Sequence, residues 1–251
     1  MPLDLTPLRR RFPGRTIVWF ESAGSTMTEA ARLAGEGCPS GTLVLAEEQT
    51  AGLGRLGRSW HSEKEAGLYA SVVLRLPLAP DGLPVVALAL GLAVQEAIQH
   101  CTGVICDLRW PNDVLVGGRK CAGILVQLQD GALIAGIGIN VNHAAFPAEL
   151  AGIATSLRMV SGGAHAREHL LVNLLEAVDV FTKILVEDGR EQILNLYSRA
   201  SSYVRGRRVQ VDQGSSSLAG TTEGLDPSGF LIVRSDSGAR QVILAGGVRP
   251  I

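Results

Sequence analysis

The segment from Ala46 to Trp60, AEEQTAGLGRLGRSW, restricts the possible structures of this chain more than any other. Its glycines let backbone amides approach an anion closely and adopt angles that other residues avoid. Its arginines carry planar guanidinium groups that bind phosphate or carboxylate through paired N–H donors. These residues are Gly52, Gly54 and Gly57, with Arg55 and Arg58 among them. The segment predicts a mobile loop that closes over a phosphate-bearing ligand, although a solvated surface turn could share the composition.

The residues before this Gly/Arg loop predict a strand, a helix and a second strand. Residues 16–20 (TIVWF) are apolar and β-rich, and residues 42–46 (TLVLA) form a buried strand that leads into the loop. Between them, Thr26 and Glu29 have the spacing of a capping box, so a helix should start there. Ser25 and Thr26 then lie at a strand-to-helix turn, where they either cap the helix or meet a polar ligand.

The middle of the chain predicts an antiparallel meander after a buried helix. Residues 68–76 read as a strand and residues 84–101 as a core helix with proline in its first turn. A strand at residues 106–110 is followed by a hairpin around Gly117 and Gly118 and by a further strand at residues 132–141. The pattern becomes helical again from Arg167 to about Ser198.

Short strands separated by Gly, Ser and Asp turns follow Tyr203 and predict a small barrel-like β domain. We therefore expect a catalytic or binding domain at residues 1–203 and a second domain at residues 204–251. The basic cluster Arg205, Arg207 and Arg208 lies at this boundary and is typical of a solvated linker.

Charge and cysteine content exclude several classes of protein. The formal net charge of −1 argues against nucleic acid as the main partner. The four cysteines, Cys38, Cys101, Cys106 and Cys121, form no C-x-x-C pair and have no histidine at ligand spacing, so no metal site is predicted. They are typical of reduced thiols in a cytoplasmic protein. We expect no signal peptide, and the apolar run at residues 83–98 is too short and too interrupted to cross a membrane.

Four clusters of polar and glycine residues carry a more specific pattern. They are Ser25-Thr26, Gln49 with the Gly/Arg loop, the run Arg109-Trp110-Pro111-Asn112-Asp113 followed by Lys120, and Gly136-Ile137-Gly138-Ile139-Asn140-Val141. In this order and spacing the chain resembles the biotin protein ligases. The corresponding family patterns are a Ser-Thr-Asn turn, Gln-x-x-Gly-Arg-Gly-Arg-x-Gly-Arg-x-Trp, Lys-Trp-Pro-Asn-Asp, Arg-Lys-x-x-Gly-Ile-Leu and Gly-Ile-Gly-Ile-Asn-Val. The resemblance extends from about Ile17 to the end of the chain.

The resemblance implies an α+β fold, with a mixed, mainly antiparallel sheet flanked by helices like that of class II synthetases, and a C-terminal SH3-like β-barrel. It implies that biotin and ATP, with Mg²⁺, condense to biotinoyl-5′-AMP. Biotin then passes to one lysine of a biotin carboxyl carrier protein, the acceptor subunit of acyl-CoA carboxylases. Too few residues precede the first strand for a helix-turn-helix domain, so we expect the monofunctional type, as a monomer or homodimer.

The resemblance also implies roles for individual residues. Ser25, Thr26 and Gln49 should face the polar ring of biotin, Gly54 and Arg55 should hold the adenylate, and Lys120 should contact the carboxylate of biotin. Asp113 should orient or deprotonate the acceptor lysine, unless it merely closes a turn. Lys120, Arg55 and Asp113 are the expected catalytic residues. The remaining expected binding residues are Gly52, Leu53, Arg58, Trp60, Trp110, Asn112, Gly123, Gly138 and Asn140.

Two residues depart from the family patterns at positions where a polar side chain would contact the ligand, so both bear on ligand affinity. Leu53 stands where the family has its first loop arginine, and Met27 stands where it has asparagine. We interpret Leu53 as packing on an apolar surface when the loop closes, although a solvent-facing position would tolerate any residue. Arg109 replaces the lysine of the Trp-Pro-Asn-Asp motif and keeps its charge.

Two other functions remain open at this point. A lipoate–protein ligase would share the fold and the adenylation chemistry, although Gln49 and the Trp-Pro-Asn-Asp motif favour biotin. A degenerate ligase that binds a nucleotide without turnover would explain Leu53 and Met27.

Overall fold

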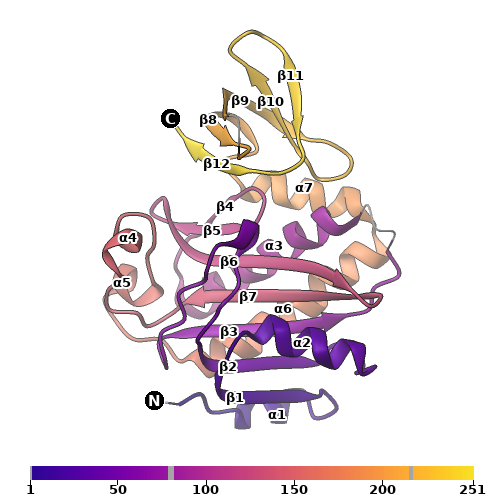
Figure 1. Ribbon diagram of the computed structural model, residues 1–251, viewed down its shortest axis with the longest axis vertical. Coiled ribbons are helices and arrows are strands. Elements are labelled where there is room, and N and C mark those ends of the chain that lie inside the picture. The colour runs from indigo at the N-terminus through magenta and orange to yellow at the C-terminus, as the bar shows by residue number, and fades with distance from the viewer. Residues whose placement is uncertain (1, 79–81, 215–216) are drawn as a thin grey trace.

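The computed structural model describes residues 2–78, 82–214 and 217–251, which form two β-sheets and the helices around them (Figure 1). The larger sheet has the strand order β1-β2-β3-β7-β6-β5-β4, with β1 and β2 parallel and the other neighbours antiparallel. Its strands are β1 (Ile17–Ala23), β2 (Leu43–Gln49), β3 (Gly67–Leu74), β4 (Asp107–Arg109), β5 (Asp113–Val116), β6 (Arg119–Gln129) and β7 (Ala132–Asn140). The helices are α1 (Thr6–Arg11), α2 (Thr26–Gly35), α3 (Leu83–Thr102), α4 (Ala148–Ala151), α5 (Leu157–Ser161), α6 (Arg167–Glu187) and α7 (Arg190–Ala200).

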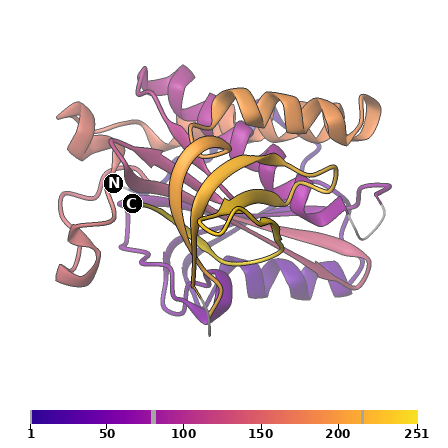
Figure 2. The same cartoon turned by 90° about the horizontal axis from the view of Figure 1, so that it is seen from above.

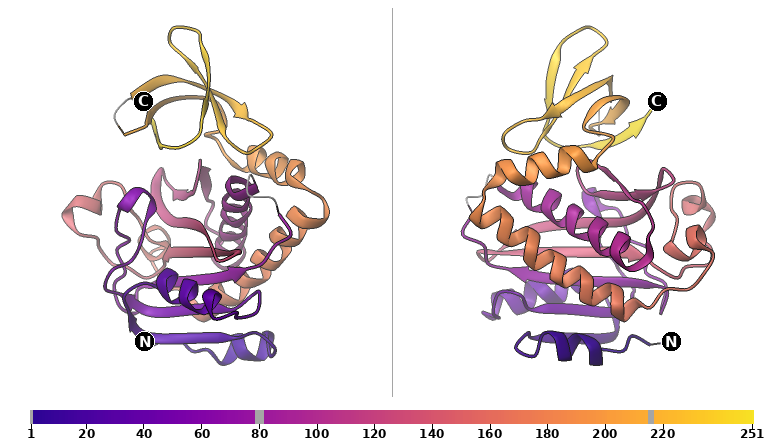
Figure 3. Two further views of the ribbon diagram at one scale, coloured as in Figure 1. Left: turned by 45° about the vertical axis from the view of Figure 1, so that its right-hand side comes forward. Right: turned by 180° about the vertical axis from the view of Figure 1, so that it is seen from behind.

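Helices cover both faces of the larger sheet, as Figure 2 shows from above. Helices α3, α6 and α7 lie on one face, which is seen from behind in Figure 3, and α2 packs on the other. Successive side chains along each strand point to opposite faces of the sheet. On β7, Ile137 and Ile139 join the large core beneath α3, whereas Ile134 packs with α2.

Helix α3 is the one helix among the described residues with the length and hydropathy of a membrane span. Most of it is buried inside the protein, because Val85, Leu88 and Ile98 and their neighbours belong to the large core. The helix therefore serves as a core element, as its sequence predicted.

The second sheet has the order β11-β10-β9-β8-β12 and is antiparallel throughout. Its strands are β8 (Arg205–Asp212), β9 (Ser217–Leu225), β10 (Leu231–Ser235), β11 (Arg240–Ile243) and β12 (Gly247–Pro250). Its buried side chains, such as Val209 and Leu231, belong to the same apolar core as the first sheet. Trp110 also joins the two sheets, because its Nε1–H donates to the carbonyl of Gly229 at 2.9 Å. Closure of this sheet into an SH3-like barrel and the domain boundary at 203/204 stay predictions.

The structure confirms the α+β fold and the meander over residues 106–141 but corrects three local expectations. The expected helix from Arg167 to Ser198 is two helices, since Gly189 between them has φ of +85°, an angle that favours glycine. Helix α2 is capped by Ser25, whose Oγ accepts from the Met27 N–H at 3.3 Å, so Thr26 is not the cap. The short helices α1, α4 and α5 were not predicted.

A buried ion pair joins the end of β2 to the start of α6. Glu47 and Arg167 have side chains only 2% and 5% exposed, and Nη1 of Arg167 lies 2.8 Å from Oε2 of Glu47. The same Nη1 donates to the carbonyl of Gly67 at 3.0 Å, and the Leu3 N–H donates to Oε1 of Glu47. This network fixes the strand that delivers Gln49 and the Gly/Arg loop.

We predict that Arg167→Met lowers the free energy of unfolding by about 3–5 kcal/mol, because it leaves the charge of Glu47 buried without its partner. Adding Glu47→Gln should restore part of that loss by removing the charge. Urea unfolding of both variants measures the effect, with the exposed Arg32→Met on α2 as a control that should change little. A double variant less stable than Arg167→Met would contradict this explanation.

Candidate active site

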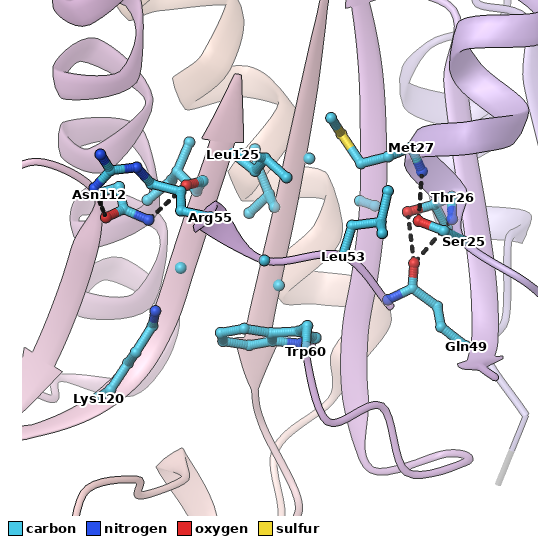
Figure 4. A pocket seen from close by; sticks show the side chains of 17 residues that line it. Ser25, Thr26, Met27, Gln49, Leu53, Arg55, Trp60, Asn112, Lys120 and Leu125 are labelled. Atoms are coloured by element: carbon cyan, nitrogen blue, oxygen red, sulfur yellow. Dashed lines mark hydrogen bonds between the residues drawn. The ribbon is translucent and has the colours of Figure 1, made fainter. Parts of the chain in front are cut away.

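The candidate site is a pocket beneath the Gly/Arg loop, and its floor is a patch of bare backbone where β6 meets β7. Gly123 on β6 pairs with Gly138 on β7, and the indole of Trp60 lies against both. A Cβ at Gly138 would lie 2.4 Å from Cε2 of Trp60, and one at Gly123 would lie 2.9 Å from its Cζ3. Both glycines are therefore required for space. Figure 4 shows the indole on this floor, between Lys120 and Gln49.

One end of the pocket is a chain of neutral hydrogen bonds around Gln49. The backbone N–H and the hydroxyl of Thr26 donate to Oε1 of Gln49 at 2.8 and 3.0 Å (Figure 4). The amide of Gln49 donates to Ser62 Oγ at 2.9 Å, and the hydroxyl of Ser71 donates to Thr26 at 2.8 Å. Donors and acceptors in this fixed array suit a neutral polar ligand group such as a ureido ring.

The other end of the pocket is cationic. Nζ of Lys120 lies 2.5 Å from Oδ1 of Asp113 and 5.2 Å from the centroid of the Trp60 ring. Arg109 contacts the second oxygen of Asp113 at 2.6 Å. Because one carboxylate faces two cations, this cluster keeps a net positive charge and attracts anions.

Arg55 reaches the same end from the Gly/Arg loop. Its Nη1 donates to Oδ1 of Asn112 at 3.2 Å and to the carbonyl of Gly246 at 3.4 Å. Asn112 is itself held, because its amide donates to the Ile124 carbonyl at 2.8 Å. Arg55 therefore contacts the turn between β11 and β12 while it lines the pocket.

Opposing effects set the charge of Asp113. Burial alone would raise the pKa of this carboxyl, but the charges and hydrogen bonds of Lys120 and Arg109 outweigh burial and lower it. Asp113 is therefore ionised at neutral pH, and a carboxylate with a lowered pKa is a weak base. Burial lowers the pKa of Arg55, with Arg58 in the same direction and Asp113 opposing, and an arginine stays charged under such shifts.

The Gly/Arg loop folds back as an irregular hairpin. The backbone N–H of Trp60 donates to the Gly52 carbonyl at 2.8 Å, and the backbone N–H of Gly54 donates to the Arg58 carbonyl at 2.7 Å. At the tip, Leu56 is 68% exposed with φ of +57°, an angle unfavourable for leucine. The pocket beneath has a volume of about 40 Å³, much less than the roughly 300–1,000 Å³ of typical ligand pockets. A ligand larger than this volume therefore requires the lining to open, and movement of the loop stays a prediction.

The structure brings eleven of the expected site residues into the pocket lining and leaves five outside it. Those in the lining are Ser25, Thr26, Gln49, Leu53, Gly54, Arg55, Trp60, Asn112, Lys120, Gly123 and Gly138. Outside it lie Gly52, Arg58, Trp110, Asp113 and Asn140. Asp113 acts on the pocket through Lys120, whereas the amide of Asn140 donates to the Thr155 carbonyl at 3.1 Å.

Sequence reasoning missed several lining residues, namely Ala70, Ile124, Leu125, Gly136 and Ile137. Gly136 was detectable, because it is two residues before Gly138 and so faces the same side of β7. A Cβ at Gly136 would lie 2.5 Å from Sδ of Met27, so the methionine packs onto the strand backbone. Leu53 also lines the pocket and is 45% exposed, which makes it neither fully packed nor fully solvated.

Comparison with known proteins agrees with this geometry. Sequence models of the Biotin/lipoate A/B protein ligase family and of the Biotin protein ligase C terminal domain match residues 19–143 and 205–248. The biotin--[acetyl-CoA-carboxylase] ligase of Mycobacterium tuberculosis is 32% identical over 98% of this chain and 94% of its own length. This chain belongs to the biotin protein ligase family. The corresponding ligase of Paracoccus denitrificans is 33% identical over 89% of this chain and 96% of its own length.

Solved structures of biotin protein ligases have the same fold. The biotin protein ligase from Aquifex aeolicus in complex with biotin and ATP superimposes with a TM-score of 0.84 and 31% identity. The superposition covers 94% of this biotin protein ligase and 99% of the Aquifex chain. Both sheets are therefore part of the family structure.

We predict that Gly138→Ala displaces Trp60, because the added methyl group cannot occupy the same space as the indole. The variant should lose about 1–3 kcal/mol of stability and should change its near-ultraviolet circular dichroism in the way that Trp60→Phe does. Gly152→Ala is the matched control, since no atom lies within 4 Å of its Cβ position. A Gly138→Ala spectrum identical to the parent spectrum would show that the indole does not rest on this floor.

Proposed function

We propose that this enzyme joins biotin to ATP, forming biotinoyl-5′-AMP and releasing pyrophosphate, and then transfers biotin to a specific lysine of a biotin carboxyl carrier protein. The observation that carries the proposal is the polarity of one pocket. Neutral hydrogen-bonding groups around Gln49 lie at one end and the cations Lys120 and Arg55 at the other, with the glycine floor between them. Biotin has the matching shape, with a neutral ureido ring and a carboxylate joined by an apolar chain.

In the first step, an oxygen of the biotin carboxylate attacks the α-phosphorus of ATP, and the bond to pyrophosphate breaks. Two anions must approach each other for this reaction, so fixed positive charge lowers the barrier. We propose that Lys120 neutralises the carboxylate and that Arg55 holds the phosphate. Their position in the lining of the pocket supports these roles. Asn112 orients Arg55 through the 3.2 Å hydrogen bond.

In the second step, the neutral amine of the acceptor lysine attacks the acyl carbonyl, and AMP leaves. We propose that Asp113 positions Lys120 for both steps rather than removing the proton of the acceptor lysine. Its lowered pKa and its contacts with Lys120 and Arg109 support this role. The amine would then lose its proton to solvent or to the departing phosphate.

Mg²⁺ in this proposal enters with the nucleotide, as Mg-ATP. Protein sites for Mg²⁺ usually supply one or two carboxylates beside the substrate phosphates. None of the described residues that line the pocket is a carboxylate, and Asp113 behind it is already paired with two cations. The lining therefore does not fit a resident Mg²⁺, and no step is assigned to one.

The partner and the location of the enzyme belong to the same proposal. We propose a carrier domain of an acyl-CoA carboxylase as acceptor, in the cytoplasm, with the enzyme acting as a monomer or homodimer. Cys38, Cys101, Cys106 and Cys121 are free cysteines, which supports that compartment.

The direct test mixes the enzyme with Mg-ATP, biotin and a carrier fragment, and measures pyrophosphate and the mass of the carrier. Biotin should give pyrophosphate and one added biotinoyl group on a single lysine. Lipoate in place of biotin should give neither. Labelling by lipoate alone would identify a lipoate ligase, and nucleotide binding without pyrophosphate would identify a degenerate binding module.

We predict that Lys120→Ala lowers the rate of pyrophosphate release by about 10²-fold or more, the usual cost of losing one transition-state contact. The fold should survive, because Arg109 still pairs with Asp113. Lys64→Ala is the matched control, since Lys64 pairs with Glu21 on the surface. A folded Lys120→Ala enzyme with unchanged pyrophosphate release would remove Lys120 from the reaction.

A further inference from the structure

Two histidines and a glutamate converge just beyond the end of the Gly/Arg loop. His61 and Glu63 follow Trp60 in the chain, and His143 follows β7. One potential ligand atom from each residue lies within 4.8 Å of the other two. None of the three residues lines the pocket beneath the Gly/Arg loop, so the cluster is separate from the site described above.

The ring of His143 is held in a defined orientation. Its Nε2 lies 3.3 Å from the hydroxyl of Tyr69, which donates its own proton to the Glu63 carbonyl at 2.9 Å. Because the Tyr69 hydroxyl donates its proton to Glu63, it can only accept from His143. Nε2 of His143 must therefore carry a proton and donate it to the Tyr69 oxygen. The ring also stacks on Phe146, with centroids 5.0 Å apart.

This arrangement leaves a buried nitrogen without a partner. His143 is 0% exposed, and its Nδ1 has no hydrogen-bond partner among the described residues. With the proton on Nε2, Nδ1 carries a lone pair. A second proton on Nδ1 would be buried without an acceptor, so the ring is neutral. A neutral imidazole whose other nitrogen is held by a neighbour is the usual form of a metal-binding histidine.

We propose that His61, Glu63 and His143 bind a divalent transition-metal cation, for which Zn²⁺ is the best fit. Two imidazoles and one carboxylate form a common three-residue set for zinc, with water in the remaining position. Mg²⁺ and Ca²⁺ fit less well because they prefer oxygen ligands. Ligand atoms about 2.0–2.1 Å from zinc lie roughly 3.3 Å apart, so the cluster must contract. Glu63 is exposed and His61 is half-buried, and both are able to move toward His143.

A cation at this site would fix the loop rather than take part in adenylation. Ser62 lies between His61 and Glu63 in the sequence and accepts the hydrogen bond from Gln49 at the neutral end of the pocket. The bound cation would therefore tie the C-terminal end of the Gly/Arg loop to the residues after β7. The cation takes no part in the proposed reaction, so enzymatic activity does not measure its binding.

The test is direct binding of Zn²⁺ to the full chain after EDTA treatment and dialysis, measured by competition with a chromophoric chelator. The wild type should bind one Zn²⁺ per chain. His61→Gln and Glu63→Gln should each weaken binding by about tenfold or more. The matched control His169→Gln, an exposed histidine on α6, and the double variant Cys38→Ser/Cys101→Ser should bind like the wild type. Wild-type binding below one equivalent, or equal binding by all variants, would overturn the proposal.

A second measurement keeps the proposal testable if a substitution harms folding. Saturating Zn²⁺ should raise the Tm of the wild type by about 5 °C or more, because the cation binds only the folded state. Glu63→Gln retains the buried His143 and should fold normally, yet it should show little of this rise. An equal rise of Tm in both proteins would place the cation elsewhere and refute the site.

Discussion

The pairing of β6 with β7 is the constraint on which the rest of the site depends. The register sets Gly123 opposite Gly138, and alternation along β7 directs the neighbouring Ile137 and Ile139 into the core. One strand therefore supplies both the apolar interior and an open floor for the pocket. A shift of one residue would exchange the two faces, placing isoleucine beneath Trp60 and glycine in the core. The many apolar contacts on the core face hold this register in place.

The two ends of the pocket are built by different physical means. The neutral end is fixed by hydrogen bonds between uncharged polar groups. Burial costs these groups little free energy, because each has a hydrogen-bond partner in place of water. The cationic end combines like charges around Asp113, and their mutual repulsion is offset by the single carboxylate. An incoming anion relieves that repulsion, whereas an incoming neutral group does not. The pocket therefore favours one orientation of a ligand that is neutral at one end and anionic at the other.

Periodicity in the sequence predicts much of the fold but less of the site. The strands of the larger sheet follow from their apolar runs, and the resemblance supplies most of the residues that line the pocket. The break at Gly189 escaped prediction because the apolar pattern continues across it on both sides. Lys120 contacts Asp113 across strands whose register shifts between Val114 and Leu115, and sequence spacing does not reveal that shift. His61 and His143 are 82 positions apart in the sequence, so only the folded chain shows that they meet.

The contact between Arg55 and Gly246 has a consequence for communication within the molecule. Nη1 donates to two acceptors, Oδ1 of Asn112 and the carbonyl of Gly246 in the turn before β12. A phosphate that takes this nitrogen must displace one of those two acceptors. If it displaces Gly246, then occupation of the pocket loosens the turn that leads into β12. The position of that turn would thereby depend on what the pocket holds, which couples the second sheet to the site.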